Sequence, residues 1–159
     1  MDCREDPGAV SSGHLNVLGY YSGQKSAYGI NVQAICTADY RFTSMSAITP
    51  GATNDWAAWN RSSLSRAVSR LPKGYFVLGD AAYPLSDKLL TPYPEKNLPP
   101  GEDTFNFHLS QLRVKIEQSL GILVSMWGIL WRPLRVRFAG RTDLIKALFH
   151  STTSCGMKR

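Results

Sequence analysis

The sequence has few cysteines, and their spacing excludes the classes of protein that depend on them. Cys3, Cys36 and Cys155 lie far apart and are odd in number among 159 residues. Zinc knuckles and small secreted domains instead have cysteines in pairs at short spacing. We therefore expect reduced cysteines that act mainly as packing residues. A chain of this length can bury roughly two thirds of its unfolded surface as one domain, so its core needs no disulfide.

Long apolar runs, internal repeats and low-complexity tracts are also absent. No segment approaches the ~20 apolar residues that a membrane span needs. The first residues, MDCREDPGAVSSGH, lack the apolar region of a signal peptide. We therefore expect a protein that is neither embedded in a membrane nor exported.

Acidic residues are scarce in the C-terminal part of the chain. The whole sequence has 18 Lys and Arg against 12 Asp and Glu, a net charge of +6. Residues 1–100 have 9 basic and 8 acidic side chains, whereas residues 101–159 have 9 basic and 4 acidic ones. Four arginines follow one another in LWRPLRVRFAGR: Arg132, Arg135, Arg137 and Arg141. Such a run with interleaved aromatic residues is typical of nucleic-acid surfaces, although a solvated basic face has the same composition.

Alternating apolar and polar residues predict two neighbouring antiparallel strands over residues 28–37 and 40–48. In the first strand, Asn31 and Gln33 are on the polar face. The opposite face is apolar and comprises Ile30, Val32, Ala34 and Cys36.

The stretch GYFVLGDAAYPL, residues 74–85, runs an apolar segment into a glycine and a carboxylate, Asp80. An apolar run between helices is typical of a central strand covered on both faces. A carboxylate just beyond such a strand lies at the rim of the sheet, where open α/β sheets have their sites. Gly79, Ala81 and Ala82 leave space around Asp80 for a metal ion and a phosphate, and a charge so near a core needs a cation or a donor. The alternative is that Asp80 only caps the following turn.

Helices are predicted on either side of that strand. Thr53 and Asn54 are both candidate N-caps for a helix that begins near Asp55, and the apolar pattern beyond it predicts two short helices in succession. A long helix is predicted from about residue 104 to 128, with Glu117 at the edge of its apolar stripe and Arg113 one turn before it. The stripe comprises Leu109, Leu112, Ile116, Leu120, Leu123 and Trp127.

The order of these motifs resembles the nuclease domain of the Harbinger-type DDE transposases and their domesticated relatives. Four blocks carry the resemblance: YYSGQKSAYGINVQAIC (20–36), RFTSMSAITPGATND (41–55), LPKGYFVLGDAAYPLSDKLLTPY (71–93) and FNFHLSQLRVKIEQSLGIL (105–123). The resemblance implies an RNase H-like α/β fold, in which a mixed sheet of antiparallel hairpin strands and a central strand is flanked by helices. It also implies that residues 16–159 form a single nuclease domain, which looks truncated, whereas residues 1–15 match poorly.

The resemblance also assigns candidate site residues. Asp80 matches the second catalytic aspartate of the family and Glu117 its catalytic glutamate, 37 residues further on. Asp55 matches an acidic position that could contact metal, cap the helix or support the site. Asp2 matches the first catalytic aspartate by its distance of 18 residues from Tyr20, but its neighbours CREDPGAVSSG cannot form the expected strand. We therefore expect the first strand to be missing or degraded.

The implied cofactor is Mg²⁺ or Mn²⁺, because carboxylate ligands suit these ions in two-metal DNA cleavage. The histidines His14, His108 and His150 are scattered and look structural. DNA is the implied partner, with an accessory DNA-binding protein as a further candidate. The candidate DNA-binding residues are Arg113, Arg132, Arg135 and Arg137.

Two functions remain open at this point. The chain is either a metal-dependent endonuclease, or an inactive, truncated transposase relic that acts at most as a DNA- or protein-binding module. By the same resemblance we expect a nuclear protein if the source is eukaryotic, and otherwise an intracellular one.

Overall fold

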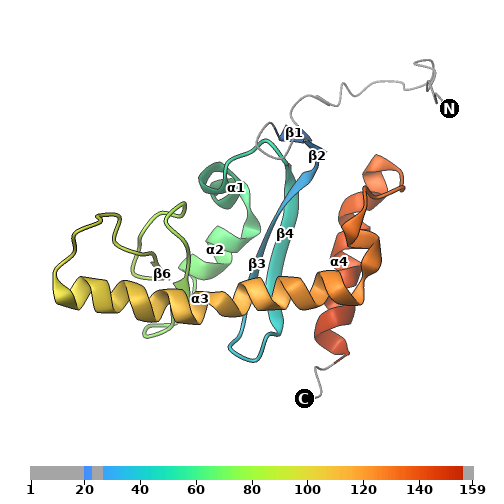
Figure 1. The fold of residues 1–159 in the computed structure, drawn as a ribbon. Coiled ribbons are helices and arrows are strands. Elements are labelled where there is room, and N and C mark those ends of the chain that lie inside the picture. Colours follow the sequence, from blue (N-terminus) through green and yellow to red (C-terminus); the bar gives the residue numbers. More distant parts are fainter. Residues whose placement is uncertain (1–19, 23–26, 156–159) are drawn as a thin grey trace.

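One long helix, α3, runs along a side of the molecule, and β3, β5, η2 and α4 pack against it (Figure 1). The computed structural model describes residues 20–22 and 27–155. In chain order the elements are β1 (Tyr21–Ser22), β2 (Ala27–Tyr28), β3 (Ile30–Cys36), β4 (Phe42–Pro50), α1 (Asp55–Arg61), α2 (Ser63–Ser69), β5 (Val77–Leu78), β6 (Leu89–Leu90), α3 (Pro100–Met126), η2 (Gly128–Trp131) and α4 (Phe138–Ser154). The described chain therefore has the mixed α/β composition that the sequence predicts.

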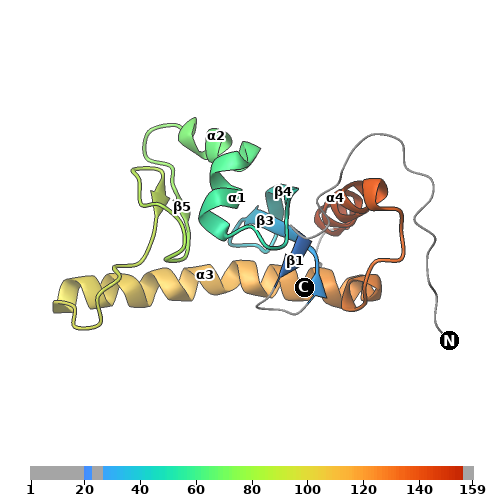
Figure 2. The same cartoon turned by 90° about the horizontal axis from the view of Figure 1, so that it is seen from above.

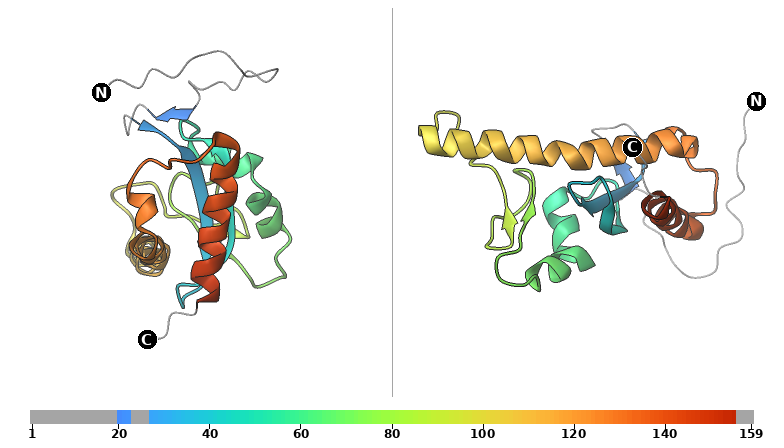
Figure 3. Two further views of the ribbon diagram at one scale, coloured as in Figure 1. Left: turned by 90° about the vertical axis from the view of Figure 1, so that its right-hand side faces the viewer. Right: turned by 90° about the horizontal axis from the view of Figure 1, so that it is seen from below.

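The predicted hairpin is confirmed in β3 and β4. These strands pair antiparallel from Ile30 opposite Pro50 to Cys36 opposite Phe42, with two register shifts along β3. The pair lies between α4 on one side and α1 with α2 on the other (Figures 2 and 3). Gln33 is only 6% exposed, because α1 covers the face of β3 that the sequence marks as polar.

Helix α1 begins where the sequence predicts, and α2 is the second short helix that the sequence predicts after it. The Asn54 side chain accepts a hydrogen bond from Ala57 N at 2.8 Å, which satisfies a free N–H group in the first turn of α1. Asp55 lies in the same turn, where a carboxylate is favoured by the helix dipole. Ser62 ends α1 and caps α2, so the two short helices follow without a loop.

Helix α3 is 27 residues long and spans about 40 Å at the usual rise per residue. It begins four residues before the predicted start because Pro100 fits the first turn, where its missing N–H group is not needed. The predicted stripe is only partly buried. Leu109 and Leu123 are 4% and 2% exposed, whereas Leu112 and Leu120 are 56% and 36% exposed and border cavities between α3 and the strands.

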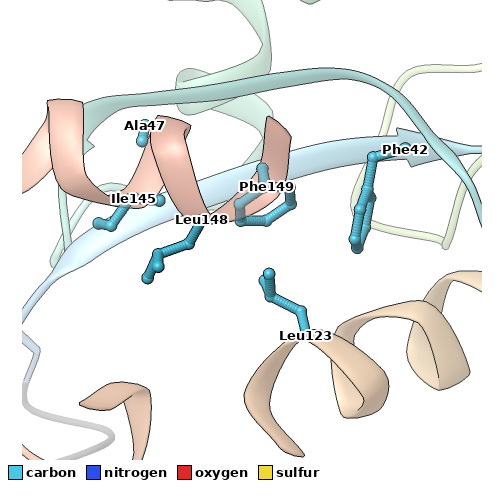
Figure 4. Packing of buried hydrophobic residues seen from close by; sticks show 6 residues of the cluster. All are labelled: Phe42, Ala47, Leu123, Ile145, Leu148 and Phe149. Carbon is cyan, nitrogen blue, oxygen red and sulfur yellow. The ribbon is translucent and has the colours of Figure 1, made fainter. Parts of the chain in front are cut away.

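Two apolar clusters hold the elements together. The larger one joins β4, α3 and α4 (Figure 4) and comprises Phe42, Ala47, Leu123, Ile145, Leu148 and Phe149. The second joins α1, α2 and β6 and comprises Trp59, Leu64, Val68 and Leu89. Each fully buried large side chain contributes about 1.5–3 kcal/mol, so the two clusters fix where α3 and the strands lie.

The prediction of a central strand covered on both faces is wrong: the strand is shorter than expected, and the residues before it are exposed. Only Val77 and Leu78 form β5, and they pair in parallel with β6, while Tyr75 and Phe76 are 66% and 54% exposed. Residues 85–90 form no helical turn: the Ser86 hydroxyl accepts a hydrogen bond from Leu89 N, and Leu89–Leu90 form β6. Over the described residues the strands form three separate pairs, β1–β2, β3–β4 and β5–β6, and not one mixed sheet.

The expected first strand cannot be compared with the structure, because residues 1–19 lie outside the described part. Among the helices of the described chain, none has the length and apolar character needed to cross a bilayer.

Candidate functional site

Asp80 lies in the turn that follows β5 and is half-buried. Its Oδ1 accepts a hydrogen bond from Ala82 N at 2.9 Å, so the turn-capping role that the sequence allowed is present. A carboxylate has two oxygens and about four acceptor positions, which leaves capacity for a further partner. Gly79 packs tightly beside it: a Cβ at this position would lie 3.2 Å from Leu89 Cδ1 and 3.3 Å from Tyr83 Cδ2. The small residue before Asp80 therefore lets Tyr83 approach.

Glu117 lies on α3, and its Oε1 is 2.8 Å from Arg113 Nη2 one turn before. The pair predicted from the sequence is thus confirmed. Both side chains are partly open to solvent: Glu117 is 56% exposed and Arg113 is 33% exposed. A helix pair of this kind stabilises the fold by only about 0.3–0.5 kcal/mol, so it is easily exchanged for another partner.

A cavity of about 210 Å³ lies between β3, β5 and α3. Asp80 and Glu117 both border it, as do Arg113, Gln33 and Tyr83. A water molecule occupies about 30 Å³ in the liquid, so the cavity has room for several waters or a hydrated ion. Asp80 and Glu117 are far apart in sequence, and the fold places both of them at the border of this one cavity.

Tyr83 stands beside the carboxylates of Asp80 and Asp55. Burial of the phenol raises its pKa, and the charges of Asp55 and then Asp80 raise it further, to about 12, while an interaction with Gln33 works in the opposite direction. The Tyr83 ring packs edge-on against Trp59 at 5.4 Å. At neutral pH the hydroxyl keeps its proton and offers a hydrogen-bond donor next to two carboxylates.

Asp55 is oriented by β3. Its Oδ1 accepts a hydrogen bond from Asn31 Nδ2 at 3.0 Å, and its backbone oxygen accepts one from Gln33 Nε2 at 3.0 Å. The N-cap of α1 is Asn54, so the alternative that Asp55 caps the helix is wrong; Asp55 lies in the first turn instead. Asp55 and Asp80 both act on the pKa of Tyr83, although Asp55 does not border the cavity of Asp80 and Glu117.

Gln33 is the residue of this cavity that sequence reasoning missed. It is 6% exposed, and its Oε1 has no hydrogen-bond partner among the described residues. The one signal in the sequence is the pair of amides at positions 31 and 33, which share a strand face. A polar strand face has the same sequence pattern whether it is solvated or buried, so this signal does not by itself identify Gln33.

The predicted DNA-binding arginines do not all lie in one place. The side chains of Arg132, Arg135 and Arg137 are exposed in the segment between η2 and α4, next to Trp131, which is 72% exposed. Arg132 borders a cavity of about 610 Å³ with Tyr28, whereas Arg113 borders the cavity of the carboxylates. The basic cluster and the carboxylates therefore line different cavities.

Asp2 and His14 lie outside the described residues, while His108 and His150 are exposed. Over the part of the chain that the structure describes, no three His, Cys, Asp or Glu side chains are grouped closely enough to hold a metal ion. The donors present are nevertheless of the type that Mg²⁺ binds, since this ion takes one or two protein carboxylates and keeps several waters. Gln33 borders the same cavity, and its Oε1 has no hydrogen-bond partner among the described residues.

The sequence profile of the DDE superfamily endonucleases matches residues 1–151, so this chain belongs to that family. A similar curated protein is "Protein ALP1-like" from Arabidopsis thaliana, which is 27% identical over 150 residues. The match covers 83% of this chain and 36% of the plant protein, so the chain spans little more than a third of that relative's length. No solved structure matches the chain significantly.

Proposed function

We propose that this chain is a nuclease domain of the Harbinger type of DDE transposase, with an RNase H-like fold over residues 16–159, and that it cleaves DNA strands with divalent metal ions. The observation that supports the proposal best is the shared cavity of Asp80 and Glu117, since a two-metal site needs carboxylates that converge on one space. Family membership points the same way.

In this proposal, Asp80 and Glu117 hold Mg²⁺ or Mn²⁺, and Asp55 or Asp2 supplies a third carboxylate. The bound ions would activate a water molecule and stabilise the leaving oxygen of the phosphodiester. Tyr83 keeps its proton because burial and the charges of Asp55 and Asp80 raise its pKa, so it adds no further negative charge near the site. Arg113 holds Glu117 in place and neutralises its charge until a cation or a phosphate arrives.

DNA would lie across the basic segment of Arg132, Arg135 and Arg137, whose exposed side chains can pair with phosphates while Trp131 is open for stacking. An accessory DNA-binding protein would add target recognition. As a DNA-cutting protein with a plant relative, the chain would act in the nucleus.

A plasmid-nicking assay tests the cleavage proposal. Purified protein should convert supercoiled plasmid to the open circle in Mg²⁺ or Mn²⁺ but not in EDTA. Asp80→Ala and Glu117→Gln should each abolish nicking. Asp87→Asn is the matched control, because Asp87 is an exposed aspartate seven residues away. Equal nicking by the wild type and Asp80→Ala would reveal a contaminating nuclease and end the proposal.

The second candidate function is a DNA-binding module without catalysis. It is favoured by the absence of a third clustered ligand residue in the described chain. It predicts salt-sensitive DNA binding without nicking. The triple variant Arg132→Gln, Arg135→Gln, Arg137→Gln should then lose affinity and lower the salt slope by up to roughly three phosphate contacts.

The matched control for that experiment changes three exposed arginines on α1, α2 and the α2 C-cap: Arg61→Gln, Arg66→Gln and Arg70→Gln. Equal losses in the two triple variants would show that only net charge matters, and the basic segment would not be the DNA surface.

A further inference from the structure

The two polar atoms of the Gln33 side-chain amide differ: Nε2 forms a hydrogen bond, whereas Oε1 forms none among the described residues. Its Nε2 donates to the backbone oxygen of Asp55 at 3.0 Å, and its Oε1 has no partner within the described chain. A buried acceptor without a donor loses the hydrogen bonds that water would give it, which destabilises the fold. A fold keeps such a group most readily where a ligand completes it.

The direction of the amide follows from the bond at Nε2. Because Nε2 is turned to the first turn of α1, Oε1 is turned away from it, and Gln33 borders the cavity of Asp80 and Glu117. A side-chain hydrogen bond from Gln33 lowers the pKa of Tyr83, which is the direction expected when an amide N–H group donates to the phenol oxygen. The contact with Tyr83 therefore engages the Nε2 end of the amide, and Oε1 keeps no partner among the described residues.

Asn31 gives an internal comparison. It also donates to Asp55, and its Oδ1 is also buried without a partner among the described residues. Asn31 does not border the cavity of the carboxylates, whereas Gln33 does. Both amides therefore donate a hydrogen bond to Asp55 in the first turn of α1, but only Gln33 also borders the cavity of the carboxylates.

We propose that Gln33 Oε1 is a direct, neutral ligand of the divalent cation that Asp80 and Glu117 bind, an inference that rests on the proposed function. Amide oxygens are hard ligands of the kind that Mg²⁺, Mn²⁺ and Ca²⁺ accept. Two carboxylates and one neutral oxygen balance the charge of one divalent ion. The ion in turn satisfies the buried acceptor that the protein leaves open.

The test measures Mn²⁺ binding by the electron paramagnetic resonance signal of free Mn²⁺, with the full chain and no DNA, so that activity is not the readout. Gln33→Met removes the oxygen at similar size and should weaken Mn²⁺ binding about tenfold or more. Gln33→Glu keeps oxygen ligands but loses the Nε2 donor, and should bind Mn²⁺ at least as tightly as the wild type. Asn31→Met, the matched control, should change the affinity less than about twofold.

The outcomes separate the possible failures. If Gln33→Met and Asn31→Met weaken binding equally, or if Gln33→Glu weakens it as much as Gln33→Met, Gln33 only supports α1 and the assignment is wrong. If Mn²⁺ binding depends on Asp80 and not on Gln33, the metal site stands and only this inference fails. If the wild type binds no Mn²⁺ at millimolar concentration, both fail. Circular dichroism of each variant without metal shows whether it folds. If Gln33→Met does not fold, the Mn²⁺ affinity of Gln33→Glu alone decides whether Gln33 is a ligand.

Discussion

Arg113 Nη2 lies 2.8 Å from Glu117 Oε1, at the edge of the cavity that Asp80 also borders. This ion pair gives Glu117 a cation when no metal is bound. A guanidinium beside a metal ligand therefore competes with a divalent ion for the same carboxylate. The competition makes the pair a sensitive test of whether Glu117 faces the metal.

Arg113→Gln should raise the affinity for Mn²⁺ about fivefold, because a guanidinium and a divalent cation at about 4 Å repel by at least about 1 kcal/mol. The same change should lower the free energy of unfolding by no more than about 0.5 kcal/mol. Isothermal titration calorimetry with Mn²⁺ gives the affinity, and urea denaturation gives the stability.

The control for Arg113 is Lys146→Gln. Lys146 forms a looser pair, with 3.9 Å between its Nζ and Asp143 Oδ1, on an exposed part of α4. Lys146→Gln removes one positive charge, as Arg113→Gln does, but away from the carboxylates of Asp80 and Glu117. If both variants bind Mn²⁺ with unchanged affinity, Glu117 does not bind the ion.

Tyr83 should make stability depend on pH above neutrality. Burial and the charges of Asp55 and Asp80 raise its pKa from 10.0 to about 12, so the folded protein retains a proton that the unfolded chain loses between these values. The stabilisation is complete below pH 10 and is lost as the pH rises towards 12. Urea denaturation at several pH values should show this loss in the wild type and a smaller loss in Tyr83→Phe.

Tyr75→Phe is the control for that series, since Tyr75 is 66% exposed. Its stability should fall with pH as steeply as that of the wild type. A Tyr83→Phe curve parallel to that of the wild type between pH 10 and 12 would mean that Tyr83 does not stand beside the carboxylates.

Leu123 should be the most sensitive position on α3. It is 2% exposed and contacts the cluster that joins α3 to β4 and α4. Leu123→Ala should lower the free energy of unfolding by about 2–5 kcal/mol. Leu112→Ala on the same helix should lower it by no more than about 1 kcal/mol, because Leu112 is 56% exposed. Urea denaturation measures both, and equal effects would contradict the partial burial of the stripe.

Features that depend on neighbouring residues could be predicted from the sequence. The β3–β4 hairpin follows from alternation, the start of α1 from Asn54, and the ion pair of Arg113 and Glu117 from their spacing on one helix. Each involves residues within one turn or one hairpin. Local chemistry therefore decides them, and the structure agrees.

Features that depend on distant packing could not be predicted. Nothing in the apolar run before Asp80 shows that β5 has two residues or that β6 pairs with it, since its partner follows a bend. Gln33 has the pattern of a solvated strand residue, and only the position of α1 shows that it is buried. That Asp80 and Glu117 border one cavity could be expected only from family resemblance, because periodicity cannot relate a strand end to a helix 37 residues later.

The central claim is that Asp80 and Glu117 bind one divalent cation together. A double-mutant cycle tests it most directly, with Mn²⁺ affinity measured for the wild type, Asp80→Asn, Glu117→Gln and the double variant. If both carboxylates bind one ion, each single change should weaken binding about tenfold or more, and the double change should weaken it by clearly less than the product of the two. Single variants that bind Mn²⁺ as tightly as the wild type, or effects that multiply independently, would contradict the shared site.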